Sequence, residues 1–458
     1  MINLNNINQI LKPVESNVLL KIFLITISSM FLETLSIALL IPILNILLDP
    51  TKIDYYLKLL SLEDKFDVSM YNQIVIFCLI SIFLVFLIKS ISLIKLNFSQ
   101  NKIIYRVKAK LSSILLKKYL GEKYSFHLKN NSTKLIQNTL NEVNRFIGEH
   151  LIPTATFLTE SFVCAGLMIV LLFVEPVGAF FTILLLIVLL YLVTRLTKNI
   201  AVEYGKIRQI NETVSLKNLT QALTGIREVK ILNKESKFNE FFDKANFKAS
   251  DSIRDYNNFV VIPRIVIELI GVTAVLFLIF FLIISGKQIS EIITILSIFG
   301  VAAFRFLPSF NRIIIALQSI KYSIPSTNVV NKEINKKFEK DKINNIKKII
   351  FESDLTLNEI NFKYENTDEK ILSNLNLNIK KNSIIGIFGE SGSGKSTLVD
   401  IVSGLLKPSS GSIKIDNKIV ESGDLLNANL IGYVSQNTFF IDDSVKKNIA
   451  FGLKDEEI

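Results

Sequence analysis

The feature that most limits the fold of this chain is a set of six long apolar runs. They are residues Val18–Leu48, Ile74–Leu96, Leu151–Val174, Val177–Leu196, Val261–Ile284 and Ile289–Leu317. A helix needs about 20 apolar residues to cross the hydrocarbon core of a bilayer. Because lipid offers no partner to backbone polar groups, runs of this kind must be helical. The sequence therefore predicts an all-α membrane domain of six helices.

The balance of charge agrees with a membrane protein. The chain carries 52 Lys and Arg against 41 Asp and Glu, a net charge of +11. Such an excess suits nucleic-acid binding, but membrane proteins also concentrate basic residues in their cytoplasmic loops. From Phe98 to His150, ten basic residues stand against three acidic ones. We therefore expect no nucleic-acid partner, and we place the long loops and both termini in the cytoplasm, at a bacterial inner (plasma) membrane.

Cysteine and histidine are too sparse for a disulfide framework or a histidine-based metal centre. Cys78 and Cys164 lie inside apolar runs, and the histidines are His127 and His150. No metal-ligand spacing is present among them. The segment Met1 to Leu20 has no cleavage-site pattern, so we expect no removable signal peptide.

Two long polar loops keep a helical pattern of apolar residues. Ile104, Val107, Leu111 and Leu115 recur at helical spacing, and the stretch Ile200–Phe247 does likewise. This periodicity indicates amphipathic helix rather than disorder. We expect the membrane helices to continue well into the cytoplasm.

The sequence changes character after the last apolar run. Residues 326–352 are rich in lysine and are expected to form a solvated helix or linker. From Ser353 onward, short runs alternate apolar and polar residues, and Ile384–Phe388 is typical of a buried strand. Further predicted strands are Ser412–Ile415 and Leu430–Val434. The predicted domains are a transmembrane domain (1–325), a linker (326–352) and an incomplete α/β domain (353–458).

One motif carries recognisable chemistry, the segment from Gly389 to Thr397. It fits G-x-x-x-x-G-K-[ST], with a predicted strand before it and a predicted helix, Thr397–Leu405, after it. Its glycines let backbone N–H groups turn toward phosphate oxygens, and the helix N-terminus adds a positive dipole. Lys395 is placed for the β- and γ-phosphates and the Ser396 hydroxyl for Mg²⁺. The predicted binding residues for ATP and Mg²⁺ are Gly389, Glu390, Ser391, Gly392, Ser393, Gly394, Lys395, Ser396 and Thr397.

With six spans, long cytoplasmic loops and a P-loop domain, the whole chain resembles an ABC exporter half-transporter. The resemblance implies that an aromatic residue ahead of the P-loop stacks on adenine, and Tyr364 stands in that place. An ordinary strand aromatic is the alternative. The segment Ile431-Gly-Tyr-Val-Ser-Gln436-Asn resembles the family's Q-loop. Gln436 would then contact Mg²⁺ and, with Lys395, belong to the catalytic machinery.

The resemblance also implies partners. The tips of the long loops, near Asn130–Ile136 and Asn211–Leu219, would be coupling helices that dock on nucleotide-binding domains. Family ATP sites form between two such domains, so a second copy of the chain is the expected partner. The signature Leu-Ser-Gly-Gly-Gln, the acidic strand with the catalytic Glu and the switch His are absent from the sequence. We therefore expect the N-terminal half of a nucleotide-binding domain, which binds ATP and needs a missing C-terminal part for hydrolysis.

Three arginines are candidate substrate contacts, because charge inside a bilayer is costly. Arg305 and Arg312 are seven residues apart on one face of the last span, and Arg264 opens the fifth span at a similar depth. Three arginines at one depth suit a phosphate or pyrophosphate head group. The alternative is that they reach lipid head groups or pair with Glu268.

The substrate class is predicted by resemblance. The segments Ala303–Arg312 and Gln318–Ser326 resemble the sixth span of ABC flippases for lipid-linked oligosaccharides and polysaccharide precursors, and Gly225–Lys230 is similar to theirs. This resemblance implies ATP-driven export or flipping of a lipid-linked glycan, with membrane lipid as a further partner. The alternatives are an exporter of other lipids, drugs or peptides, and a non-hydrolysing nucleotide-binding membrane protein.

Overall fold

The chain folds as two compact units in a computed structural model. The structure describes residues 4–15, 17–39, 42, 46, 71–174, 176–286, 289–336, 350–364, 367, 369–420, 430–436 and 438–457. The first unit holds Met1–Tyr119 and Ser132–Lys337, and the second holds Leu120–Asn131 and Phe338–Ile458. The short segment Leu120–Asn131 therefore belongs with the C-terminal residues, although helices of the first unit flank it in the sequence.

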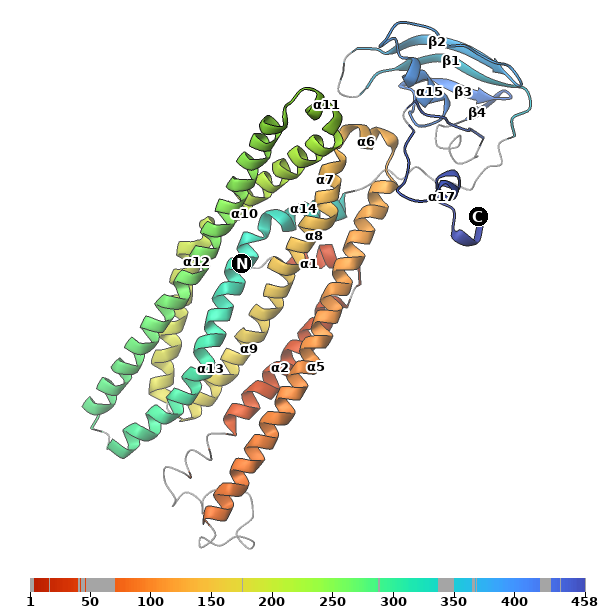
Figure 1. The fold of residues 1–458 in the computed structure, drawn as a ribbon. Coiled ribbons are helices and arrows are strands. Elements are labelled where there is room, and N and C mark those ends of the chain that lie inside the picture. The colour runs from red at the N-terminus through yellow and green to blue at the C-terminus, as the bar shows by residue number, and fades with distance from the viewer. Residues whose placement is uncertain are drawn as a thin grey trace. The chain divides into compact units, whose positions relative to one another are not determined.

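The first unit is helical over most of its described residues (Figure 1), and the described residues of the six predicted runs lie in helices, apart from the turn at Leu39. These helices are α2 (Val18–Ala38), α5 (Tyr71–Leu120), α9 (Ile152–Val174), α10 (Pro176–Thr224), α12 (Glu235–Ile284) and α13 (Ile289–Tyr322). Among the described residues, four segments are long and apolar enough to cross a membrane: Val18–Ser36, Val75–Leu120, Ser132–Ile169 and Glu235–Ile284. The prediction of a helical membrane domain is confirmed.

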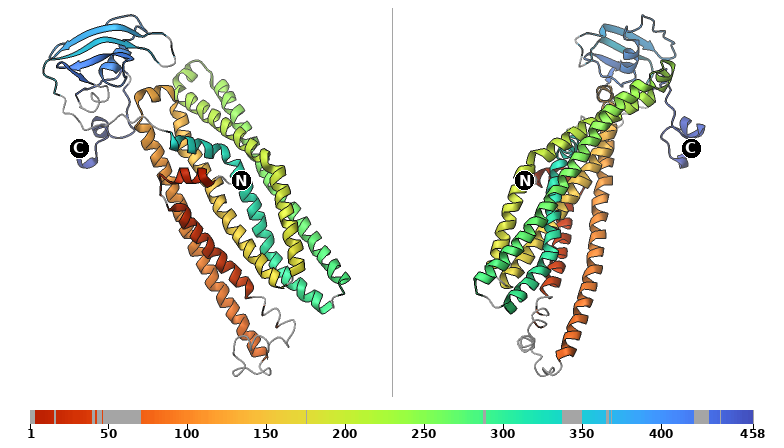
Figure 2. Two further views of the ribbon diagram at one scale, coloured as in Figure 1. Left: turned by 180° about the vertical axis from the view of Figure 1, so that it is seen from behind. Right: turned by 60° about the vertical axis from the view of Figure 1, so that its left-hand side comes forward.

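Three of these helices are much longer than a bilayer is thick. α5, α10 and α12 have 50, 49 and 50 residues. At about 1.5 Å per residue such a helix is roughly 75 Å long, more than twice the hydrocarbon core. Figure 2 shows α10 and α12 running side by side, with the short α11 (Ile226–Ile231) joining them. The predicted continuation of the helices beyond the apolar runs is confirmed.

The helix that leads into α9 contains two π-helical segments. In chain order it consists of α7 (Ser132–Gln137), η3 (Asn138–Glu142), α8 (Val143–Arg145) and η4 (Phe146–Leu151). π-helices are rare and occur often at functional sites. Their hydrogen bonds join residue i to residue i+5, so a turn holds more residues than an α-turn. Phe146 and Ile147 in η4 are fully buried, so the irregularity lies in the packed interior.

Apolar packing joins α9 to α13 in the membrane part of the unit. Val163 and Leu167 of α9 pack with Phe310 and Ile314 of α13, and all four side chains are buried. Full burial of such side chains stabilises by about 1.5–3 kcal/mol each in water, although within lipid close packing replaces that driving force. The two helices therefore hold one another at a fixed register.

Two short helices complete the first unit. α1 (Leu4–Leu11) packs against α14 (Ile324–Asn335), with Ile7 and Ile10 fully buried. α14 buries Val330 and Ile334 and follows α13 after a bend at Ser323. The first residues of the predicted linker are thus a packed helix of the first unit.

The second unit is built on a four-stranded antiparallel sheet of order β2-β1-β3-β4. Leu398 and Ile401 of the helix after the P-loop pack into the core of this sheet. The strands are β1 (Asp354–Phe362), β2 (Leu372–Lys380), β3 (Ser410–Ile415) and β4 (Lys418–Val420), and the helices are α6 (Tyr124–Lys129), α15 (Lys395–Val402), α17 (Val445–Ile449) and the 3₁₀ turn η5 (Asp455–Glu457).

Two predicted strands are wrong. Ile384–Phe388 and Leu430–Val434 have irregular backbone, and neither pairs with any residue in the described part of the chain. A central strand is stable only when neighbours on both sides take its backbone groups. In the part of the chain that the structure describes, the four strands of the sheet pair with one another alone, and Ile384 and Phe388 are 101% and 94% exposed. The predicted strand Ser412–Ile415 is confirmed within β3.

The turn between β3 and β4 anchors the start of the sheet. Asp416 and Asn417 have φ values of +48° and +66°, as a tight two-residue hairpin turn requires. The Asp416 carboxylate accepts hydrogen bonds from the backbone N–H groups of Glu352, Ser353 and Asp354 at 2.7, 2.6 and 3.0 Å. One side chain therefore ties the beginning of β1 to the hairpin.

Candidate nucleotide-binding and transport sites

The P-loop is a tight turn, and two of its positions have a backbone conformation that favours glycine. Gly392 and Gly394 have φ values of +86° and +88°. A Cβ on Gly394 would come within 2.9 Å of the Ile371 side chain and 3.2 Å of the Ile371 carbonyl oxygen. A Cβ on Gly392 would meet nothing within 4 Å, so that side of the loop faces open space. The backbone is therefore free to approach a ligand at Gly392.

Lys395 lies across this loop at the first residue of α15. Its Nζ donates hydrogen bonds to the carbonyl oxygens of Gly389 and Glu390 at 2.9 and 2.6 Å. Within the described residues, the backbone N–H groups of Gly392, Gly394 and Ser396 donate to no acceptor. An ammonium and several free N–H groups at a helix N-terminus form a donor set for phosphate oxygens. The predicted residues Gly389 to Thr397 thus fit a nucleotide phosphate chain.

Tyr364 lies beside the P-loop helix. Its hydroxyl is 3.3 Å from Thr397 Oγ1, and its ring meets Phe362 edge-on at 5.0 Å. The ring is half-buried and packs against the core of the sheet. The structure therefore brings Tyr364 next to the predicted phosphate site. The predicted contact of its ring with adenine stays a prediction.

The short helix α6 approaches the same region from a distant part of the sequence. Burial, followed by the nearby Asp400, Tyr433 and Tyr364, raises the pKa of the Tyr124 phenol. Burial also raises the pKa of Asp400 on α15. Tyr124 is a residue near the nucleotide site that the sequence did not single out. An aromatic residue just before the loop tip is a weak signal, because many exposed helices carry one.

The loop tips lie elsewhere than predicted. Asn130–Ile136 was expected to be one tip, but the short helix is α6 at Tyr124–Lys129, and α7 begins at Ser132. Asn211–Leu219 was expected to be the other, but it lies inside α10, and the chain turns at Gly225 and Asn233. The first turn comes earlier than expected, between α5 and α7, whereas α10 continues past the second expected tip to Thr224, so loop position alone is a poor guide.

Gln436 is exposed and lies in a bend after the irregular segment 430–434. Within the described residues its side chain has no hydrogen bond to the P-loop. Its predicted role as a Mg²⁺ contact stays a prediction.

The three candidate arginines divide among different environments. Arg264 Nε lies 3.2 Å from Glu268 Oε1, and both side chains are mostly exposed. Arg312 Nε lies 2.7 Å from Glu160 Oε1 of α9, with Arg312 42% and Glu160 10% exposed. The side chain of Arg305 lies outside the described residues. Pairing of Arg264 with Glu268 is the alternative that the sequence offered, and for this arginine the structure agrees with it.

The Arg312–Glu160 contact leaves hydrogen-bonding atoms unused. Arg312 Nη2 and Glu160 Oε2 are buried and have no hydrogen-bond partner among the described residues. The short distance from Nε to Oε1 is an ion pair, although its angles do not meet hydrogen-bond geometry. Unsatisfied charged groups inside a membrane helix bundle are typical of a substrate pathway. Glu160 is a candidate residue that sequence analysis missed, because a single acid in an apolar run reveals no partner.

Comparisons with known proteins fit this arrangement. Residues 18–305 match the family of ABC transporter transmembrane regions, and residues 372–458 match the ABC transporter family. Since the first match covers more than half of the chain, this protein belongs to the ABC transporter family. The second match implies ATP binding. The fold is similar to that of a bacterial Atm1-family ABC exporter with ATP bound, with a TM-score of 0.71 at 15% identity over 96% of this chain and 75% of that one. The predicted fold class, a helical exporter domain followed by a nucleotide-binding domain, is confirmed.

Three sequence relatives each match between 22% and 26% of this chain. A probable ABC transporter ATP-binding/permease protein of Haemophilus influenzae is 35% identical over 22% of this chain and 18% of its own length. Energy-coupling factor transporter ATP-binding protein EcfA1 of Ligilactobacillus salivarius is 39% identical over 23% of this chain and 38% of its own. Multidrug resistance-like ATP-binding protein MdlB of Buchnera aphidicola is 32% identical over 26% and 20%. The matches span well under half the length of these relatives.

Proposed function

We propose that this chain forms part of an ATP-driven exporter that acts as a homodimer in a bacterial inner membrane, with both termini in the cytoplasm. The observation that carries the proposal is the P-loop, where Lys395 and unpaired backbone N–H groups converge at the start of α15. The long helices of the first unit supply the membrane domain that such an exporter needs.

The P-loop residues would hold ATP and Mg²⁺. Lys395 exchanges two carbonyl partners for phosphate oxygens, and the free N–H groups of Gly392 and Gly394 donate to the same oxygens. The Ser396 hydroxyl is a ligand for Mg²⁺, which neutralises phosphate charge when bound. Tyr364 orients the base, and Gln436 relays the state of the nucleotide. Hydrolysis would also need the signature motif and the acidic strand, which the sequence lacks.

A second copy is proposed from the exposed apolar residues of the cytoplasmic tip. Ile231 and Leu232 at the end of α11 are 68% and 63% exposed, far from the apolar runs that lipid covers. Exposed aliphatic side chains in water favour burial against a partner. This supports a homodimer, in which the α11 tip of one copy would contact the nucleotide-binding unit of the second copy.

For the substrate we propose a lipid-linked glycan. Arg312 and Arg305 would bind its phosphate or pyrophosphate group, and the substrate would pass Arg264 on its way to them. The spare Nη2 donor of Arg312 supports an oxygen-rich anionic group. The pairing of Arg312 with Glu160 favours a second candidate, a substrate with both charges, such as a peptide or a zwitterionic lipid. Both candidate substrates are compatible with an exporter, so they differ in the substrate specificity that they imply and not in the class of protein.

Transport assays on the full-length protein in liposomes test the proposal. We expect ATP with Mg²⁺ to drive flipping of a lipid-linked oligosaccharide, and Lys395→Ala to abolish binding of a fluorescent ATP analogue. Arg312→Ala should reduce flipping by roughly tenfold or more, as losing a charge-assisted hydrogen bond does. Arg254→Ala is the matched control, since Arg254 is exposed and paired with Asp251 and Asp255.

The outcomes separate the candidate functions. Unchanged flipping in Arg312→Ala and Arg305→Ala sinks the arginine-bound phosphate. Transport of a peptide or zwitterionic lipid in place of the glycan supports the second candidate. Tight ATP binding without phosphate release in the full-length protein supports a non-hydrolysing nucleotide-binding membrane protein instead.

A further inference from the structure

The bend between α13 and α14 is lined by buried polar groups. Tyr322, Ser323 and Ser326 are 2%, 0% and 0% exposed. α14 is the last helix of the first unit, and the chain runs from it to the nucleotide-binding unit. A movement of the nucleotide-binding unit that reaches the membrane helices through the linker must therefore pass this bend, whereas the other connections along the chain run through α5 and α7.

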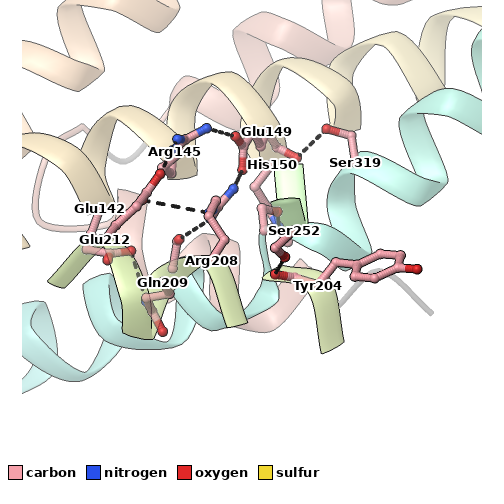
Figure 3. A network of polar contacts seen from close by, with 12 residues as sticks. Glu142, Arg145, Glu149, His150, Tyr204, Arg208, Gln209, Glu212, Ser252 and Ser319 are labelled. Atoms are coloured by element: carbon pink, nitrogen blue, oxygen red, sulfur yellow. Dashed lines mark hydrogen bonds and ion pairs between the residues drawn. The ribbon is translucent and has the colours of Figure 1, made fainter. Parts of the chain in front are cut away.

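Arg208 of α10 holds the bend from one side. It is fully buried, and its Nη2 donates to Ser326 Oγ at 3.1 Å while its guanidinium lies over the Tyr322 ring at 4.3 Å. Its Nη1 donates to Glu149 Oε2 of η4 at 2.7 Å. Figure 3 shows Arg208 among polar side chains of this region, with Glu149 as one of its partners. The charge of Arg208 is therefore compensated, and its planar fork fixes three partners at once.

The π-helix η4 holds the bend from a second side. Ser319 Oγ donates to the backbone carbonyl oxygen of Glu149 at 3.0 Å, and His150 Nδ1 lies 2.9 Å from Ser323 Oγ. A π-turn changes the backbone hydrogen-bond pattern of a helix, which makes a carbonyl such as that of Glu149 accessible to another helix. The bend is thus tied to the helix that becomes α9.

Close packing holds the bend from a third side. Tyr256 of α12 stacks on Tyr322 with ring centroids 3.7 Å apart and an interplanar angle of 7°. Gly205 of α10 faces the Tyr322 carbonyl oxygen so closely that a Cβ there would overlap it. Three helical elements, η4, α10 and α12, therefore meet at one turn of backbone.

Arg208 also has a partner that it does not fully use. Its Nε lies 3.8 Å from Glu212 Oε2 and makes no hydrogen bond in the described part of the chain. A modest displacement of Arg208 would exchange Ser326 for Glu212, keeping the charge paired throughout. Buried directional contacts favour discrete arrangements over continuous deformation, as two-state elements require.

We propose that Arg208 is a positioning residue for transport, a clamp on the α13–α14 bend that transmits nucleotide-driven movement of α14 to the membrane helices. With Ser326 bound, α14 is held to α10 and η4. With Glu212 bound, the bend is released and α14 moves separately. The clamp rests on the proposed nucleotide-driven export and is independent of the substrate.

The test is a distance within one copy of the full-length protein. Spin labels at Lys217→Cys on α10 and Asn328→Cys on α14, both exposed positions, report the separation of the two helices. Native Cys78 and Cys164 are replaced by Ser and Ala, and labelled protein is diluted with unlabelled protein. Distances are measured without nucleotide and with a non-hydrolysable ATP analogue and Mg²⁺.

With Arg208 present we expect two narrow populations whose ratio the nucleotide changes. Arg208→Gln should broaden the distribution in both conditions while the affinity for the nucleotide stays within about twofold, since the P-loop is untouched. Arg208→Lys, which keeps the charge without the planar fork, should give an intermediate width. Arg254→Gln, at an exposed and paired arginine, should match the unmodified protein.

A purely structural role would give a different pattern. Native two-population behaviour in folded Arg208→Gln would overturn the clamp. If that variant does not fold, Ser326→Ala decides, because it removes only the acceptor on the bend; an unchanged distribution there overturns the proposal as well. Failure of nucleotide binding in the unmodified protein counts against the proposed function, and the nucleotide-free widths still test the clamp.

Discussion

Two arginines in the same helical unit show how differently a buried charge can be accommodated. Arg208 is fully buried, and carboxylate, hydroxyl and aromatic partners surround it. Arg312 has one ion-pair partner, is 42% exposed, and keeps an unused donor. Removing a charge from water is costly unless partners replace the lost solvation. The first arginine therefore specifies an arrangement of helices, whereas the second has capacity left for a ligand.

The largest expected effect is on stability at Arg208. Among the described residues, Arg208→Met leaves the Glu149 and Glu212 carboxylates with Arg145 as their one ion-pair partner. Breaking a buried ion pair on one side costs about 3–5 kcal/mol, and we expect the lower end because Glu149 is partly exposed. Thermal unfolding in detergent should show this loss. The double variant Arg208→Met with Glu149→Met should recover part of it, and absence of recovery would mean that packing alone matters here.

Gly205 tests whether the surroundings of Arg208 are rigid. Gly205→Ala places a methyl group against the Tyr322 carbonyl oxygen, so the backbone of α10 or of the bend must shift. Overpacking of this kind costs about 1–3 kcal/mol. Gly148→Ala in η4 is the matched control, since a Cβ there meets nothing within 4 Å. We expect the first variant to unfold at a lower temperature and the second to be neutral or slightly stabilised.

At Arg312 we expect a smaller loss of stability and a larger change in function. Arg312→Gln keeps a donor for Glu160 and should lower the free energy of unfolding by about 1 kcal/mol, the usual value of one hydrogen bond. Flipping should fall far more than stability. A loss of stability equal to that of Arg208→Met would erase the distinction between the two arginines.

The smallest effect is expected at Asp416, whose side chain is partly exposed. The backbone N–H of Glu352, assisted by those of Asp354 and Ser353 and by Lys381, holds the pKa of this carboxyl below its usual range. The folded-state pKa is below the unfolded one, so the stabilisation is present at neutral pH and disappears as the pH falls through the folded pKa.

Two substitutions separate charge from hydrogen bonding at Asp416. Asp416→Asn keeps an Oδ1 acceptor for Ser353 and Asp354 and tolerates the positive φ, whereas Asp416→Ala keeps neither property. Thermal unfolding between neutral pH and pH ~3 should show a larger acid-dependent loss in the unmodified protein than in either variant. We expect Asp416→Ala to unfold at the lowest temperature of the three.

The membrane helices were predictable from the sequence because burial in lipid leaves only one option for a long apolar run. The P-loop was predictable for a related reason, since φ values such as those of Gly392 and Gly394 restrict the residues that fit. The irregular backbone of Ile384–Phe388 was not predictable, because a strand depends on neighbouring strands that a local sequence pattern does not reveal. The predicted position of the second loop tip was wrong because α10 continues past the expected turn.

Arg208 was invisible in the sequence for a further reason. It lies in a polar, amphipathic stretch where most charged residues face water, and its i+4 neighbour Glu212 is equally common in exposed helices. Its burial follows from the approach of η4, α13 and α14, which are distant in the chain. The spacing of apolar residues shows which face of a single helix is buried. It does not show whether several helices together enclose a charged side chain.

The two π-segments before α9 have a consequence for how the sequence can vary. Each carries one residue more per turn than an α-helix, so a deletion of a single residue in η3 or η4 can be absorbed by restoring α-helical geometry. Such a deletion leaves Glu160 and Val163 on the face of α9 that packs against α13, because only the extra residue of the wide turn is lost. A deletion in an α-helical part of the same helix has no such outlet and turns every later residue by about 100° around the axis. We therefore expect length variation between related chains to occur in η3 or η4 rather than in α9.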